Sequence, residues 1–179
     1  MRSVSVHGGR FRGVSVAGQR FRMLNLTGVL LEECDLSNSE WEASLLEEVT
    51  LKGCRMTGFR LRGGRTTDLT LTDCHGQYAQ MEGVEMKGSR FVSCAFNDSS
   101  LTRCNLAGAR FSDCDLRNVV LDGSRMKGAD LRGCRIDGLR ASLDDLSGAI
   151  LDPRQAAAVV YAQAQISVLE IGEAVPDWP

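Results

Sequence analysis

Large apolar residues recur at every fifth position along most of the chain. From Val6 to Leu151 there are 30 such positions, and 27 of them hold Val, Ile, Leu, Met, Phe or Trp. The exceptions are Thr66, Gly76 and Ala141, and no insertion breaks the spacing. Apolar positions recur about every 3.6 residues in an amphipathic helix and about every 2 in a strand, so neither explains this period. The pattern indicates a chain that changes direction after every five residues.

The positions on either side of each large apolar residue have their own character. Small or apolar residues lie two positions before it, and all seven cysteines fall there. Two positions after it lie 15 of the 19 glycines, and Asn or Asp often replaces a missing Gly, as at Asn38 and Asp113. These residue types tolerate a positive φ best, which favours a tight turn in every repeat. The sequence therefore predicts a regular repeat protein.

The repeat resembles that of the pentapeptide-repeat family, which reads small residue, Asp or Asn, Leu or Phe, polar residue, Gly. Cys34–Asn38, Cys104–Gly108 and Ala129–Gly133 fit this motif, and the similarity covers about 150 residues. Arg often stands in place of Asp or Asn, as at Arg20 and Arg55. The resemblance implies an all-β fold, a right-handed quadrilateral β-helix in which four pentapeptides form one coil of about 20 residues.

The cysteine spacing is a separate check on the coil length. Stacked coils lie about 4.8 Å apart, whereas a disulfide needs Cβ atoms about 3.8 Å apart, so we expect reduced thiols in the core. A straight line of buried sulfurs cannot form a tetrahedral metal site, and we predict neither a metal nor a cofactor. Six cysteines are spaced by 20 residues and would form one column: Cys34, Cys54, Cys74, Cys94, Cys114 and Cys134.

Charged residues alternate in sign between positions 20 residues apart. Arg22, Glu42 and Arg62 form one such series, and Asp35 with Arg55 another. We interpret these charges as pairs between stacked coils, which disfavour a slip in register although each contributes little. The alternative is that the acidic stretch contacts a partner. The candidate partner surface then comprises Glu32, Glu33, Asp35, Glu40, Glu42, Glu47 and Glu48.

The repeat ends at Leu151, which divides the chain into a β-helix of residues 1–151 and a C-terminal segment of residues 152–179. Asp152 followed by Pro153 predicts the start of a short helix that caps the last coil, and Ile166–Ile171 a short extended segment. Family members with such a helix often dimerise through it, so this segment is a candidate cap or homodimer interface. Its candidate residues are Pro153, Ala156, Val159, Val160 and Ala164.

Two places in the repeat are expected to be weak. No comparable cap precedes Val4, so the first residues or a partner must cover the N-terminal end. Gly64 and Gly76 remove side chains from one coil, so we expect a local irregularity around residues 62–80. Either the coil bulges there, or Phe59 and Tyr78 fill the space.

Composition and isolated polar residues point away from catalysis. The net charge is −2, and no stretch is apolar enough for a signal peptide or a membrane span, which favours a cytoplasmic protein without direct nucleic-acid or membrane binding. His75 follows Cys74, but the repeat places them on opposite sides of the wall. Catalytic sets of Ser, His and acidic residues have no cleft in a filled rod, so we predict no enzyme.

The resemblance also implies a function. The quinolone-resistance branch of the family forms rods that resemble duplex DNA and engage DNA gyrase, a type II topoisomerase. We therefore expect a protein–protein interaction, with gyrase binding by DNA mimicry and resistance to topoisomerase poisons as one hypothesis. This chain lacks the long loop insertions of some gyrase-protecting relatives. The alternative is a scaffold for an unrelated partner or a purely structural repeat protein.

Overall fold

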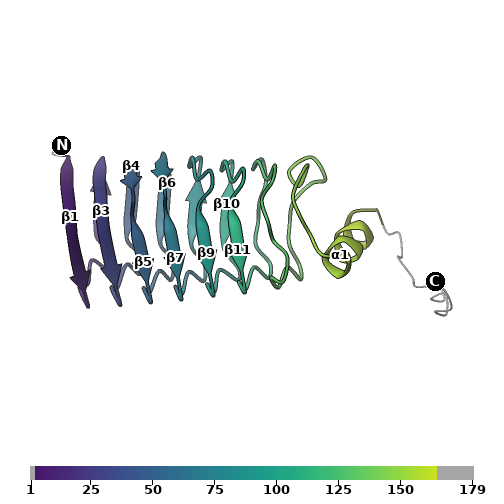
Figure 1. The fold of residues 1–179 in the computed structure, drawn as a ribbon, viewed down its shortest axis with the longest axis horizontal. Helices are drawn as coiled ribbons and strands as arrows, with labels where there is room; N and C mark the ends of the chain where they lie inside the picture. Colours follow the sequence, from purple (N-terminus) through teal and green to yellow (C-terminus); the bar gives the residue numbers. More distant parts are fainter. Residues whose placement is uncertain (1–2, 165–179) are drawn as a thin grey trace.

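A computed structural model describes residues 3–164, which form a straight rod of stacked coils (Figure 1). The described residues contain eleven strands in one parallel sheet that winds around the rod. Every registered pair of strand residues is 20 positions apart, as for Val4 with Leu24 and Arg20 with Glu40. The predicted quadrilateral β-helix with 20-residue coils is therefore confirmed.

The strands are short because each one occupies a side of the coil between two turns. In the sheet they follow the order β10-β8-β6-β4-β3-β5-β7-β9-β11, with β1 paired to β3 and β2 to β4. The strands are β1 (Val4–Arg12), β2 (Arg20–Arg22), β3 (Leu24–Glu32), β4 (Glu40–Glu47), β5 (Thr50–Lys52), β6 (Arg60–Thr67), β7 (Thr70–Thr72), β8 (Gln80–Glu82), β9 (Arg90–Val92), β10 (Ser100–Thr102) and β11 (Arg110–Ser112).

The corners of the coil are the tight turns that the glycine spacing predicts. In the described part of the chain, all thirteen non-glycine residues with positive φ lie two positions after the inward position of a repeat, which is apolar in all but the repeats of Thr66 and Gly76. Asn38 and Asp73, with φ of 55° and 53°, occupy the same place in the turn as Gly53 with φ of 61°. The left-handed turn therefore belongs to the repeat, and glycine is its least strained occupant.

The core is a set of side-chain columns that run along the rod. Phe91 and Phe111 stack one coil apart, with ring centroids separated by 4.5 Å and planes inclined by 4°. The seven cysteines are buried with free thiols, and Cys54 Sγ lies 3.4 Å from the carbonyl oxygen of Leu31. Burial raises the pKa of the Cys104 thiol to about 11. The prediction of reduced core cysteines agrees with this geometry.

The register is unbroken across residues 62–80, but Gly64 has a φ of 101°, outside the 61–74° of the turn glycines, so the expected irregularity is a small change in the backbone at Gly64. A Cβ on Gly76 would lie 2.2 Å from the ring of Phe96, so this ring from the next coil already occupies the space. The buried Thr66 hydroxyl is 3.2 Å from that of Ser89. Phe59 is buried as expected, but Tyr78 is exposed and fills nothing. The register continues through β6, β7 and β8.

The helix α1 (Pro153–Ala164) lies across the last coil. Asp152 caps it: its carboxylate accepts from the Gln155 backbone N–H (3.0 Å), and the Gln155 side-chain oxygen accepts from the Asp152 N–H (2.9 Å). This reciprocal pair is a capping box. Val159 packs against the core, Ala156 and Val160 are half-buried, and Pro153 is exposed. The side chain of Ala164 and the predicted extended segment lie outside the described residues.

Candidate interaction surface

Because apolar side chains fill the rod, its functional groups lie on the outside. His75 is exposed and Cys74 is buried, so the two do not form a site. Within residues 3–164, no three His, Cys, Asp or Glu side chains are placed to hold a metal ion. Over the same residues, no helix has the length and apolar character to cross a membrane. The remaining candidate site is the pattern of charges on the faces of the rod.

Three of the predicted acidic residues are neutralised by arginines one coil away. Glu32 pairs with Arg10, and Glu33 Oε1 lies 2.9 Å from Arg12 Nη2. Asp35 Oδ2 lies 2.8 Å from Nη2 of Arg55, which is on the following coil. The sequence pattern assigns Glu32 to Arg12, so the actual contacts are shifted diagonally. A two-residue diagonal neighbour is within reach of side chains as long as Arg and Glu.

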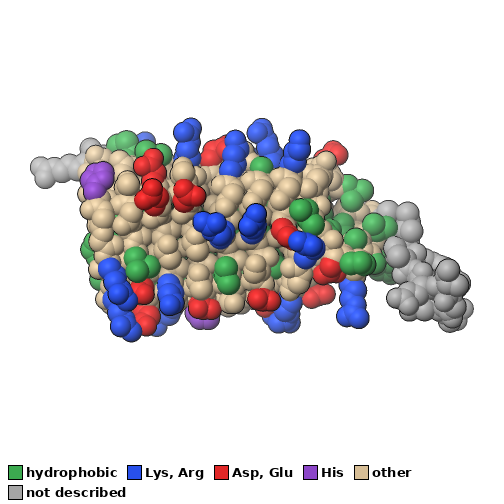
Figure 2. All heavy atoms as spheres, viewed as in Figure 1, with side chains coloured by type: hydrophobic (Ala, Val, Ile, Leu, Met, Phe, Trp, Pro, Cys, Tyr) green, Lys and Arg blue, Asp and Glu red, His purple; other side chains and the backbone are tan. Residues whose placement is uncertain are grey.

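A chain of alternating charges runs along one face through two further candidates. Glu40 contacts Arg20 (3.4 Å) and Arg62 (3.2 Å), and Glu42 contacts Arg22 (3.6 Å). The series continues from Arg62 to Glu82 and on to Arg103. On the face of the rod that Figure 2 shows, both acidic and basic side chains are present. Five of the seven candidate acids therefore face a guanidinium.

Two of the paired carboxylates, Glu33 and Asp35, are stabilised in the ionised form by their neighbours. A hydrogen bond from Arg12, reinforced by its charge, lowers the pKa of Glu33. Hydrogen bonds from Ser37 lower the pKa of Asp35, and the charge of Arg55 adds to this effect. At neutral pH these groups are negative, but each negative charge is balanced within about 4 Å, which weakens the field that a distant partner meets.

Glu47 and Glu48 differ from the other five. Both are exposed, and neither forms an ion pair with a residue in the described range. Glu47 ends β4, while Glu48 occupies the following turn with φ of 52°. Leu45, on the same strand, has 44% of its surface exposed. These residues form a small acidic and apolar ridge, which we call the β4 ridge: Leu45, Glu47 and Glu48.

Arg90 and Arg110 are two stacked arginines without an ion pair to a described residue, although Asp130 lies one coil beyond Arg110. The pKa of Asp130 is lowered by a hydrogen bond from Arg132 and, to a lesser extent, by the charge of Arg110. Arg90 and Arg110 occupy equivalent positions in β9 and β11, one coil apart on the same face. Both are exposed, and neither makes an ion pair with any residue from 3 to 164. Two like charges at neighbouring positions of a parallel ladder are unfavourable by themselves. An acidic group from outside would relieve that repulsion.

Other charge pairs lie within a coil and were not predicted. Arg117 binds Asp115 with two hydrogen bonds of 2.8 and 2.6 Å, and Arg132 binds Asp130 in the same way at 2.9 and 2.7 Å. The hydrogen bond from Arg132 lowers the pKa of Asp130 to about 2. The signal was present in the sequence as Asp-Leu-Arg, because residues i and i+2 of an extended segment project on the same side.

Comparisons with known proteins agree with this architecture. The family model described as pentapeptide repeats matches with eight copies, over residues 25–63 and 99–138. None of the curated proteins matches by sequence. Both matched ranges lie within the coils described above.

Solved structures with a similar fold include other repeat proteins. A trypsin-treated variant of QnrB1, a plasmid-mediated fluoroquinolone resistance protein, is 14% identical over 93% of this chain and 98% of its own, with a TM-score of 0.47. HetL, a pentapeptide repeat protein from the cyanobacterium Nostoc involved in regulating heterocyst differentiation, is 15% identical over 84% and 90%, with a TM-score of 0.29. By its matched repeats and its four-sided coils, this chain belongs to the pentapeptide-repeat family.

Proposed function

We propose that this protein acts by binding another protein and carries out no chemical reaction itself. Side chains such as Leu106, Phe96 and Met126 fill the interior of the rod and are fully buried. A filled interior leaves no space where polar groups from different elements could converge on a small substrate. The rod instead offers long, straight faces with charged groups at regular intervals, which suit recognition of an extended partner surface.

The partner that we propose is a type II topoisomerase, with DNA gyrase as the specific candidate. The observation that carries this proposal is the shape of the rod. Residues 4–151, at 20 residues a coil and about 4.8 Å between coils, give a straight rod about 36 Å long. An enzyme that grips a segment of duplex DNA has a binding channel for an object of this kind. The quinolone-resistance branch, which the repeat resembles, supports the same partner.

If this chain mimics DNA, we expect only a small part of its surface to resemble DNA in charge. Duplex DNA carries about one negative charge per 1.7 Å, whereas the arginines balance most of the acids here. The β4 ridge keeps its charge, so Glu47 and Glu48 are the acids that we expect to contact the topoisomerase. Glu42, which contacts Arg22, serves the stacking of coils in this proposal.

A second candidate function is binding to an unrelated protein with an acidic surface. Arg90 and Arg110 favour it, because neither guanidinium forms an ion pair with a described residue, although Asp130 is stacked one coil beyond Arg110. Two parallel donor groups about one coil apart could bind carboxylates of a partner through charge-assisted hydrogen bonds.

The test is DNA supercoiling by purified gyrase, with and without a fluoroquinolone. We expect the wild-type protein to change supercoiling or relieve the drug's inhibition. The double variant Glu47→Gln with Glu48→Gln should weaken this effect about tenfold, equivalent to about 1.4 kcal/mol of binding, at unchanged thermal stability. The matched control Glu42→Gln should retain it. A wild-type protein without effect on gyrase would overturn the topoisomerase proposal.

The second candidate is tested by the same assay with Arg90→Ala and Arg110→Ala. If the partner is gyrase through the β4 ridge, this variant behaves as the wild type. Loss of the effect in the arginine variant, together with full activity of the Glu47 and Glu48 variant, would move the contact to β9 and β11 and contradict the ridge assignment.

A further inference from the structure

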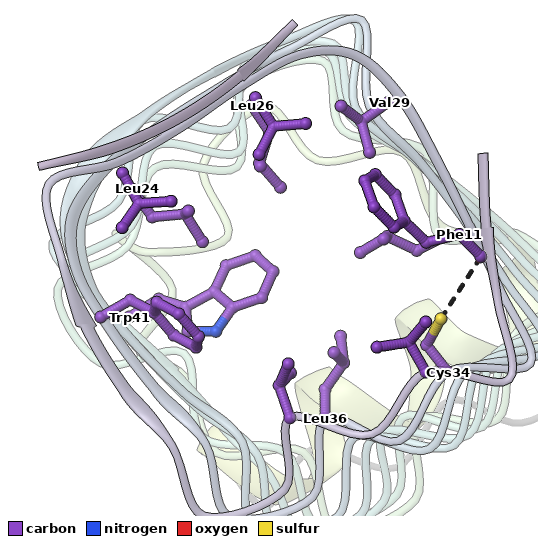
Figure 3. Close-up of a pocket in the computed structure, with 13 residues that line it drawn as sticks. Phe11, Leu24, Leu26, Val29, Cys34, Leu36 and Trp41 are labelled. Carbon is purple, nitrogen blue, oxygen red and sulfur yellow. Dashed lines mark hydrogen bonds between the residues drawn. The ribbon is translucent and has the colours of Figure 1, made fainter. Parts of the chain in front are cut away.

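The N-terminal end of the rod is an open apolar socket. Figure 3 looks into it along the rod, with side chains from all four walls pointing inward. The first coil has Val6 and Val16 at inward positions where the second coil has Leu26 and Leu36, and a hollow of about 190 Å³ remains. Thirteen residues line it: Val4, Val6, Phe11, Val14, Val16, Phe21, Leu24, Leu26, Val29, Leu31, Cys34, Leu36 and Trp41.

The socket is apolar and accessible at the same time. Val4, Phe11 and Val14 have 42%, 37% and 42% of their surfaces exposed, whereas equivalent side chains in the middle of the rod are buried. At the rim, β1 pairs only with β3 among the described strands, so its other edge presents unpaired backbone N–H and C=O groups. An exposed strand edge beside an apolar hollow is suited to accept one more strand.

The charges around the socket restrict what that strand can be. The first 22 residues contain five arginines and no acid. Four of them, Arg10, Arg12, Arg20 and Arg22, each lie against an acid of the second coil. Since the charges alternate from coil to coil, the next layer outward would be acidic. A second copy stacked by its own first coil would bring four more arginines to the same rim, so this arrangement is disfavoured.

We propose that the socket binds the C-terminal segment, residues 165–179, of a second copy of this chain. The segment contains Glu170, Glu173 and Asp177 and no basic residue. Its apolar residues include Ile166 and Ile171, which are 15 and 20 positions after Leu151 and so keep the five-residue register. The segment adds to the free edge of β1, with apolar side chains in the hollow and carboxylates against the arginine rim.

The segment must come from another copy because of the distances involved. Helix α1 and strand β1 lie at opposite ends of the rod (Figure 1). An extended chain spans about 3.3 Å per residue, so about 11 of the 15 residues after Ala164 would be needed only to cover the 36 Å of the rod. Two copies can exchange segments side by side in antiparallel fashion, or each copy can bind the next in a row.

The test is sedimentation velocity of the full-length chain over a range of concentrations. We expect reversible association, as either a dimer or a longer series. Reversing the segment's charge, with Glu170→Lys, Glu173→Lys and Asp177→Lys, should weaken association at least tenfold. Arg10→Glu with Arg12→Glu at the socket should do the same. A mixture of these two variants should associate again, because each supplies the charge that the other has lost.

Controls keep the result specific. Arg125→Glu with Arg140→Glu, which reverses two arginines on coils far from the socket, should associate as the wild type does. A synthetic peptide of residues 165–179, added in excess to the full-length wild type, should dissociate the assembly, and this result does not depend on the folding of any variant. A wild-type chain that stays monomeric, or a charge-reversed segment that associates unchanged, would overturn the proposal.

Discussion

The two ends of this rod are built from the same repeat and are finished in opposite ways. At the C-terminal end, α1 lies over the last coil, and the Gln155 side-chain amide donates hydrogen bonds to the carbonyl oxygens of Leu131 (2.7 Å) and Cys134 (2.8 Å). At the N-terminal end, Phe11 is exposed and the edge of β1 has no partner among the described residues. Since each coil contacts only its neighbours, the stability of each end depends on the residues that cover its terminal coil.

The difference shows that an end is defined by a few side chains rather than by the repeat. The last coils contain the same kinds of residues as the first. At the C-terminal end, however, the side chain of Gln155 binds two backbone carbonyl groups for which no further coil supplies a donor. We therefore expect local unfolding to begin at the first coil and to reach the helix-covered end last.

Removal of the helix should have the largest effect and should make the two ends alike. A chain that stops at Leu151 exposes the apolar end of the last coil to water and loses the hydrogen bonds to the carbonyls of Leu131 and Cys134, which contribute about 0.5–1.5 kcal/mol each. A chain that stops at Ala164 keeps the helix and serves as the control. We expect a clearly lower thermal midpoint and aggregation in light scattering for the shorter chain alone. Equal midpoints for the two truncations would show that α1 does not act as a cap.

The next largest effect should come from shortening one core side chain at each end of the rod, because the two ends differ in how tightly they are packed. Leu131 is 1% exposed beneath the helix, so Leu131→Ala should cost about 2–5 kcal/mol. Val6 lies at the open socket, where neighbouring space is already empty, so Val6→Ala should cost less than about 1 kcal/mol. Chemical denaturation measures both free energies of unfolding. A larger loss for Val6 than for Leu131 would contradict the view that the first coil is loosely closed.

A single substitution in the cap tests its hydrogen bonds. Gln155→Ala leaves two carbonyls without their donor and breaks the capping box, so we expect a loss of about 1–3 kcal/mol. Gln163 is exposed and donates one bond to Ala141, so Gln163→Ala is the control and should lose less than about 1 kcal/mol. Hydrogen exchange should show faster exchange in the last coil for Gln155→Ala only.

Ion pairs between coils should contribute less to the free energy of unfolding than the helix cap or the core side chains at the ends. Asp35→Arg and Arg55→Asp each break one exposed pair, and the double exchange restores it in the opposite sense. We expect a coupling of about 0.2–1 kcal/mol in a double-mutant cycle, reduced by salt. Zero coupling at low salt, with lost partner binding in the single variants, would assign Asp35 to a partner surface.

The smallest effect should come from the charge of Asp152. Hydrogen bonds from the Gln155 N–H, and then from Gly133, lower the pKa of Asp152 in the folded chain. A lowered pKa stabilises the fold above the ordinary carboxyl pKa, and this contribution is lost as the pH falls through the lowered value. Asp152→Asn keeps a capping side chain without the charge, so it should be slightly less stable than the wild type at pH 7, and the difference should disappear as the pH falls through the lowered pKa. A gap that persists at low pH would contradict this assignment.

The backbone architecture was predictable because every repeat contains the same information. The five-residue spacing, the turn residues and the cysteine column each lead to the 20-residue coil, and Asp152 with Pro153 correctly predicts where the helix starts. The irregularity expected near Gly76 did not follow, because Phe96 on the next coil is large enough to fill the space. A missing side chain in one coil is thus compensated by its neighbour, which a position-by-position count does not detect.

The candidate surface was less predictable than the fold. The sequence correctly places the acids opposite arginines, but it assigns Glu32 to Arg12 although Arg10 holds it. Long side chains reach diagonal as well as direct neighbours, and backbone register alone does not decide between them. The role of Glu47 and Glu48 in partner binding stays a prediction, as does a dimer through α1.

The unbroken register described for the coils has a consequence for how this protein can change in length. Deleting one residue anywhere between Val6 and Leu151 would exchange inward and outward side chains for the whole chain that follows. Removing five, for example residues 112–116, would restore the inward positions but turn the following coils by one wall, so that Cys94 would stack on Val119 and Arg110 on Arg135. Only a whole coil can be gained or lost without such a conflict. The evolutionary step for this rod is therefore the coil rather than the residue.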